Sequence, residues 1–223
     1  MKKLNINTNG NKKLRNTENV RFIIWNLPAV KTYPFRTAMC EKSCYARKAE
    51  RVYPTVLPSR EQNYLDSLEY DFAENMIYTI EEELKKKKYI GKKVVFRIHE
   101  SGDFYNQTYF DKWVKIVQHF ENTDNIVFLA YTKSLPYVIN GGYNGNLFPS
   151  KLVIRSSIWK DTAPVNVNLT GILNIPMYTA LTQSEMDTER AAGHIFTVCK
   201  CDDCATCGEC WNKSVKDIIC KIH

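Results

Sequence analysis

Four apolar runs of strand length recur along the chain and constrain its fold more than any other feature. They span residues 20–25, 94–98, 126–131 and 152–157, and residues 177–181 are expected to form one more strand. The run at 126–131 is almost continuously apolar, which is typical of a strand buried on both faces. These runs therefore predict the strands of a parallel sheet.

Amphipathic helices are expected between the strands. Apolar residues recur at intervals of three and four from Leu65 to Leu84, behind a predicted N-cap at Ser59 with Gln62 at capping-box distance. This pattern predicts one long helix, and a similar pattern predicts another over 108–120. Because strands alternate with helices, we expect an α/β protein with an open, partial parallel barrel-like sheet.

The chain of 223 residues is long enough for one large domain or for one domain with an appendage. With 44% hydrophobic and 25% charged residues, it is neither a disordered nor a fibrous protein. We predict a flexible basic arm over residues 1–18, an α/β domain over 19–198, and a Cys-rich metal-binding segment over 199–223 that packs on the domain.

The first residues and the hydropathy indicate the compartment. No apolar run of signal-peptide length follows the amino-terminal lysines, and no stretch reaches the roughly 20 apolar residues of a membrane span. A cytoplasmic protein without a membrane partner is therefore expected. In the cytoplasm, clustered cysteines more often bind metal than form disulfides, and a secreted disulfide scaffold is the less favoured alternative.

The net charge of +7 is a weaker indication of a partner. A lysine run at 85–88 and the basic amino-terminal arm would both attract nucleic-acid phosphates. A solvated helix end explains the lysine run better, because positive charge is favourable at the carboxyl end of a helix. Nucleic acid is kept as a candidate partner.

Five cysteines lie within twelve residues near the carboxyl end, and they predict a metal site: Cys199, Cys201, Cys204, Cys207 and Cys210. Repeated CxxC steps allow thiolates to turn inward around one ion, and any four would satisfy tetrahedral zinc. Alternatively, the five divide between sites together with the cysteines near residue 40. Cys220 and His223 are further candidate ligands, less favoured than the five.

A second pair of cysteines, Cys40 and Cys44, begins a predicted short helix after the first strand. Two thiolates on one helical turn could share a metal ion or an iron–sulfur cluster. The alternative is that both are small buried apolar residues.

The segment 99–104 follows the second strand and is predicted to carry chemistry. His99 and Asp103 are candidate acid–base groups, and Gly102 would allow the backbone to approach a ligand closely. The alternative is a strand-end turn in which Asp103 caps the next helix. Because ligands of parallel sheets bind at the carboxyl ends of strands, we expect the polar groups after successive strands to surround one mouth.

Several motifs in order resemble the phage "gene product 88" domain family: the segments 26–32, 40–48, 96–104 and 131–134, and the Cys-rich run that ends in Cys210-Trp211. The resemblance covers nearly the whole chain and implies a phage or mobile-element protein that acts in the bacterial host. The family has no settled activity. Its members tend to carry a further cysteine where this chain has Tyr33.

A more distant resemblance is to the radical S-adenosylmethionine enzymes. Cys40-xxx-Cys44-Tyr45 is similar to the start of their signature, although Arg47 stands where a third cysteine is expected. The resemblance implies a four-iron four-sulfur cluster on Cys40, Cys44 and a later cysteine.

It also implies that S-adenosylmethionine binds at Tyr45, Ser101, Gly102 and Asp103. The substrate, a small molecule or a macromolecule, is not indicated. The alternative function is a zinc-stabilised nucleic-acid-binding or interaction protein without catalysis.

Overall fold

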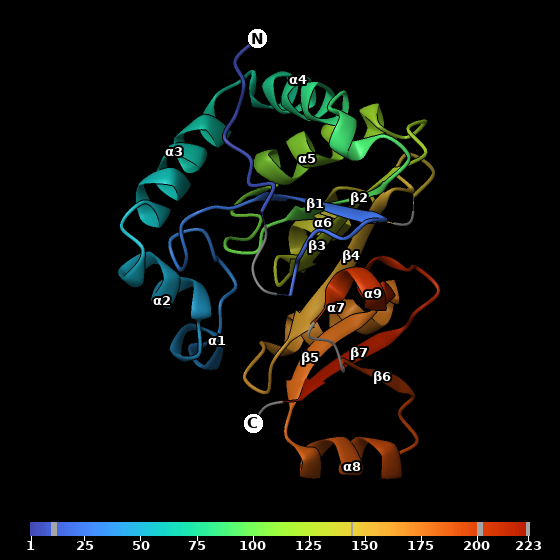
Figure 1. Cartoon of the computed structure of the whole chain (residues 1–223). Coiled ribbons are helices and arrows are strands. Elements are labelled where there is room, and N and C mark those ends of the chain that lie inside the picture. Colours follow the sequence, from blue (N-terminus) through green and yellow to red (C-terminus); the bar gives the residue numbers. More distant parts are fainter. Residues whose placement is uncertain (10–12, 144, 200–202, 222–223) are drawn as a thin grey trace.

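The computed structural model describes residues 1–9, 13–143, 145–199 and 203–221. Seven strands in these ranges form one sheet of order β1-β2-β3-β4-β5-β7-β6, in which all neighbours are parallel (Figure 1). The strands are β1 (Val20–Trp25), β2 (Lys93–Ile98), β3 (Ile126–Thr132), β4 (Leu152–Ile158), β5 (Met177–Leu181), β6 (Phe196–Cys199) and β7 (Asp217–Lys221). Within the described ranges the edge strands β1 and β6 do not pair with each other, so the sheet is open.

Helices connect the parallel strands, as the alternating pattern predicts. They are α1 (Ala38–Lys42), α2 (Tyr45–Val52), α3 (Val56–Leu68), α4 (Phe72–Leu84), α5 (Gln107–His119), α6 (Leu135–Asn140), α7 (Pro164–Leu173), α8 (Gln183–Ala191) and α9 (Cys204–Cys207), with short 3-10 turns η1 (Lys87–Tyr89) and η2 (Glu209–Trp211). The α/β class and the open parallel sheet are thereby confirmed. No helix within the described ranges is both long and apolar enough to cross a bilayer.

The predicted single helix after Ser59 is wrong, because two helices, α3 and α4, occupy this region. Ser59 lies inside α3, whose N-cap is Thr55, and the chain is extended at Glu69 between the helices. The buried residues of α3 are polar: Arg60, Asn63, Asp66 and Ser67. The spacing of apolar residues, taken alone, therefore merged α3 and α4 into one predicted helix.

Alternate residues of the strands bury two different faces of the sheet. On one face, Phe96, Phe128 and Ile154 contribute to a large core that includes α4 and α5 residues. On the other face, Phe22, Val95, Val127, Leu129 and Val153 form a smaller cluster, against which Cys204, Ala205, Cys210 and Trp211 pack. The Cys-rich segment thus covers the face of the sheet that α4 and α5 leave open.

Arg155, on β4, fixes this segment in place. Its side chain is fully buried and donates all five of its N–H groups to backbone carbonyls, at 2.6–3.1 Å: those of Glu209, Cys210, Asn212, Val215 and Lys216. Hydrogen bonds from a charged donor are stronger than neutral ones. One guanidinium therefore joins the centre of the sheet to the turn that leads into β7.

The predicted basic arm contains residues that pack on the domain. Leu4 is buried, and its backbone N–H donates to Thr79 Oγ1 at 2.8 Å. Asn7 forms an antiparallel bridge with Ile24 of β1. The proposed division of the chain into an arm, a domain and a terminal segment stays a prediction.

Replacing Arg155 with Met leaves five carbonyl oxygens without their charged donor. We expect the free energy of unfolding to fall by about 3 kcal/mol or more, because each unsatisfied buried polar group costs about 1–3 kcal/mol. Urea denaturation followed by circular dichroism measures this. The matched control is Arg190→Met, which removes a half-exposed pair with Asp187 and should cost at most about 1 kcal/mol. Equal losses in both variants would contradict the role of Arg155.

Candidate functional site

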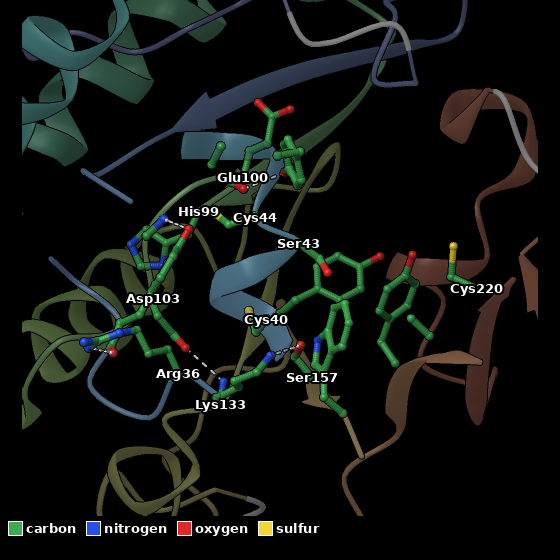
Figure 2. A pocket seen from close by; sticks show the side chains of 18 of the residues that line it. Arg36, Cys40, Ser43, Cys44, His99, Glu100, Asp103, Lys133, Ser157 and Cys220 are labelled. Atoms are coloured by element: carbon green, nitrogen blue, oxygen red, sulfur yellow. Dashed lines mark hydrogen bonds between the residues drawn. The ribbon is translucent and has the colours of Figure 1, made fainter. Parts of the chain in front are cut away.

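A cavity of about 660 Å³ opens at the carboxyl ends of the strands. Its walls come from segments that follow β1, β2, β3 and β4, together with residues of β5, α9 and β7 (Figure 2). The volume lies within the usual range of small-molecule sites. Parallel strands end at the same edge of a sheet, so polar groups that are far apart in the sequence meet here.

Cys40 and Cys44 both line this cavity. Cys40 lies in α1, where its backbone N–H donates to the N-cap Thr37, and Cys44 is the N-cap of α2. Burial raises the pKa of the Cys40 thiol, and the charge of Lys133 opposes this rise. At Cys40, desolvation therefore has a larger effect on the thiol pKa than the nearby positive charge.

Tyr33 and Arg47, which stand where resemblance suggests cysteines, differ in their surroundings. The Tyr33 hydroxyl lies in the cavity wall and accepts the Gly102 N–H at 2.8 Å. Burial raises the pKa of Tyr33 to about 12, so the phenol is neutral. Arg47 is half exposed and pairs with Glu41. Tyr33 therefore supports the loop after β2, whereas Arg47 faces solvent.

The predicted ligand loop is held by its own backbone contacts. Ser101 is fully buried and exchanges two hydrogen bonds with Leu27, through its carbonyl and its hydroxyl. Gly102 has a φ of 101°, and a Cβ there would lie 2.6 Å from Leu27 Cβ. Gly102 is thus required for close approach to Leu27, and it also lines the cavity; Ser101 does not.

Asp103 accepts hydrogen bonds from three neighbours. Its carboxylate binds the backbone N–H groups of Phe104 at 2.7 Å and Lys133 at 2.9 Å, and the Thr132 hydroxyl. Burial raises its pKa, while these hydrogen bonds oppose the rise. Asp103 does not cap α5, because Asn106 does so by accepting from Tyr109 N–H. The carboxylate instead joins the loops after β2 and β3.

His99 borders the cavity, but its ring packs in the aromatic core. It lies edge-on to Phe104, and Nε2 hydrogen-bonds the Tyr109 hydroxyl at 2.8 Å. Burial, and then the charge of Arg97, lower the pKa of His99 to about 3, so the ring is neutral. Its Nδ1 has no hydrogen-bond partner among the described residues, and its φ of 63° is left-handed.

Lys133 and Arg97, two of the basic residues that line the cavity, were not assigned a specific role from sequence. Lys133 is only 7% exposed, and its Nζ donates to Ser157 Oγ at 2.7 Å. Arg97 stacks on the Tyr131 ring, with its guanidinium carbon 3.6 Å from the centroid. The available signal was a charge inside the apolar run 94–98 and a lysine two residues after the end of the run 126–131.

The terminal cysteines divide into two groups. Cys204 lines the cavity, and so does Cys220, which was only a reserve ligand. Cys199, Cys207 and Cys210 are not among its lining residues, whereas Cys201 and His223 lie outside the described residues. In the described part of the chain, no three His, Cys, Asp or Glu side chains are grouped closely enough to hold a metal ion.

Cys199 and Cys220 are register partners on β6 and β7. Hydrogen bonding from Cys199, and also from Tyr178, lowers the pKa of Cys220 to about 6, although burial opposes this. Burial raises the pKa of Cys204 to about 11. The two cavity thiols of the terminal segment therefore differ: the pKa of Cys220 is lowered and that of Cys204 is raised.

Three of the four lysines in the run at 85–88 form ion pairs with acidic residues. Lys86 and Lys88 pair with the buried Glu83 at 2.5 and 2.9 Å, and Lys85 pairs with Glu82. These contacts explain the run as a stabilised helix end.

Comparison with known proteins indicates relatives in phages. A family model described as "Gene product 88" matches residues 2–213. The chain is 32% identical over 103 residues to a "Gene 88 protein" of Mycobacterium phage D29, and 31% identical over 103 residues to that of Mycobacterium phage L5. Each alignment covers 45% of this chain and 42% of the relative, less than half its length.

No solved structure matches the chain. The descriptions of the family and of both relatives name no activity, cofactor or ligand. The comparisons confirm the predicted resemblance to the gene product 88 family, and they do not extend to the radical S-adenosylmethionine enzymes.

Replacing Asp103 with Asn should destabilise the protein. An amide nitrogen cannot accept the hydrogen bonds that the carboxylate receives, so at least one buried donor loses its partner. We expect the free energy of unfolding to fall by about 1–3 kcal/mol, measured by urea denaturation. Asp111→Asn on the exposed face of α5 is the control, with less than about 0.5 kcal/mol expected. Unchanged stability of Asp103→Asn would show that these hydrogen bonds do not hold the loops.

Proposed function

The chain belongs to the gene product 88 family, and from this premise we propose that it is a metalloprotein whose cavity holds an iron–sulfur cluster. The observation that carries the proposal is the position of four thiols. Cys40 and Cys44, which follow β1, line the same cavity as Cys204 and Cys220 from the terminal segment. Cysteines separated by 160 residues along the chain thus line one cavity.

The chemistry of these donors fits a thiolate-bound group. Sulfur ligands select zinc and iron–sulfur clusters over harder ions such as magnesium. Asp103, one of two acidic residues that line the same cavity, already accepts three hydrogen bonds. Cys40 and Cys44 would hold the cluster on one side, and a later cysteine would supply the third thiolate.

In its finer form, the proposal is a radical S-adenosylmethionine-like enzyme. A bound four-iron four-sulfur cluster supplies one-electron transfer, here to S-adenosylmethionine. Tyr45, whose hydroxyl donates to the Glu100 carbonyl at 2.7 Å, would present its ring to this ligand. Gly102 and Asp103 would contact it from the loop after β2, which Ser101 holds in place.

His99 has a different role in this proposal. Because the ring is neutral, it would position groups by hydrogen bonding rather than carry a positive charge. The substrate of the proposed enzyme would enter the same cavity. We also propose that the protein acts in the cytoplasm of the bacterial host.

The second candidate is a zinc site in the terminal segment that stabilises a binding protein. The observation that favours it is a short turn: Cys204 and Cys207 lie in α9, and Gly208, with a φ of 71°, leads directly to Cys210. Arg155 already fixes this segment, so zinc there would add stability without catalysis. Nucleic acid is the partner proposed for this second function.

Metal content after anaerobic purification tests both candidates. The iron–sulfur proposal predicts a brown protein with iron and sulfide, and loss of both in Cys40→Ser and Cys44→Ser. Cys207→Ser, whose side chain does not line the cavity, is the matched control and should keep them. The zinc proposal predicts the reverse pattern, in which Cys207→Ser loses zinc and Cys44→Ser keeps it.

Two results would reject these assignments. A colourless protein that contains only zinc, even after anaerobic reconstitution with iron and sulfide, rules out the cluster. For nucleic acid, a mobility-shift assay across salt concentrations should show binding that weakens steeply as salt rises. Absence of binding at low salt would remove that partner.

A further inference from the structure

A buried ammonium group lines the cavity, and within the described ranges no carboxylate forms an ion pair with it. Lys133 is 7% exposed; its Nζ donates to the neutral Ser157 hydroxyl, and its side chain also hydrogen-bonds the Cys40 thiol. Asp103, which lines the same cavity, accepts hydrogen bonds from the backbone N–H groups of Phe104 and Lys133 and from the Thr132 hydroxyl. None of these donors is the Lys133 ammonium. Burying a charge is unfavourable unless it is paired. An anionic ligand would supply the missing charge.

A second cation, Arg97, lines the same cavity. Arg97 donates Nε–H to the His99 carbonyl at 3.1 Å and stacks on Tyr131. Its terminal N–H groups have no hydrogen-bond acceptor among the described residues. A guanidinium binds phosphate or carboxylate through paired N–H groups. Arg97 and Lys133 together make this wall suitable for a doubly charged anion.

Aromatic rings form the adjoining wall. Trp159 and Tyr178 line the cavity together with Tyr131, and Tyr131 and Tyr178 pack edge to face with centroids 4.7 Å apart. The Lys133 ammonium lies 5.9 Å from the Trp159 ring centroid. Flat aromatic faces next to cations are the combination that stacks a nucleobase and holds its phosphate.

We propose that this cavity binds a nucleoside monophosphate, with the phosphate at Lys133, Ser157 and Arg97 and the base against Trp159 and Tyr178. A volume of about 660 Å³ accommodates one nucleotide rather than a longer segment. The side chains assigned to the nucleotide differ from those assigned to the metal, although Lys133 contacts Cys40, one of the proposed cluster ligands. A nucleotide carries both groups that these walls suit: an anion for the cations and an aromatic base for the rings.

Calorimetric titration of the full chain with AMP, GMP, CMP and UMP tests the proposal. We expect at least one of them to bind, and the matching nucleoside and inorganic phosphate each to bind at least tenfold more weakly. Quenching of tryptophan fluorescence should accompany binding, and Trp159→Phe should reduce this signal. If none of the four nucleotides binds, or if the nucleoside binds as tightly as its phosphate, the proposal is wrong.

Variants assign the phosphate position. Lys133→Met should weaken nucleotide binding at least tenfold. Its stability should not fall, since a buried unpaired charge is removed. Lys93→Met, at the exposed amino-terminal end of β2, is the matched control and should bind as the parent does. If Lys133→Met fails to fold, Arg97→Met carries the same expectation of tenfold weaker binding.

Cys44→Ser separates this proposal from the proposed metal function. We expect it to lose iron while it keeps nucleotide affinity. If a single-stranded decanucleotide binds and no mononucleotide does, the size argument is overturned. Unchanged affinity in both Lys133→Met and Arg97→Met would reject the assigned anion site.

Discussion

The interaction on which the site depends most is the set of five hydrogen bonds from Arg155. An open sheet has two faces, and in this chain helices α4 and α5 bury only one of them. Arg155 rises from the centre of the other face and binds five carbonyls of the terminal segment. The segment can therefore cover the apolar side chains of that face, and Cys204 is placed in the cavity wall.

The cavity is bordered by groups whose charges are satisfied to different degrees. Asp103 is fully engaged by the loops that it joins, and Tyr33 supports Gly102. Lys133 Nζ donates to the Ser157 hydroxyl and Arg97 Nε to the His99 carbonyl, and both cations have further N–H groups that carboxylates of the described residues do not pair with. Asp103 and Tyr33 thus hold the cavity together, whereas Lys133 and Arg97 are available to a ligand. The charge of the proposed ligand is therefore inferred from these two cations and not from Asp103.

Much of the site could be predicted because strand ends are visible in sequence. Residues after each apolar run must reach the same edge of a parallel sheet, so Cys40, Cys44 and Asp103 were expected around one mouth, and all three line the cavity. The division between α3 and α4 could not be predicted. The buried face of α3 is polar and hydrogen-bonded, and periodicity detects only apolar faces.

The sequence by itself determined the α/β class, the open parallel sheet and the family, because buried strands and ordered motifs are local patterns. Tertiary structure decided which cysteines share a space, what Asp103 binds, and that the charge of Lys133 faces a cavity. These properties depend on partners that are distant along the chain, and the spacing of residues contains no information about such partners. Arg155 is the clearest case, since its five acceptors are backbone carbonyls 54–61 residues away.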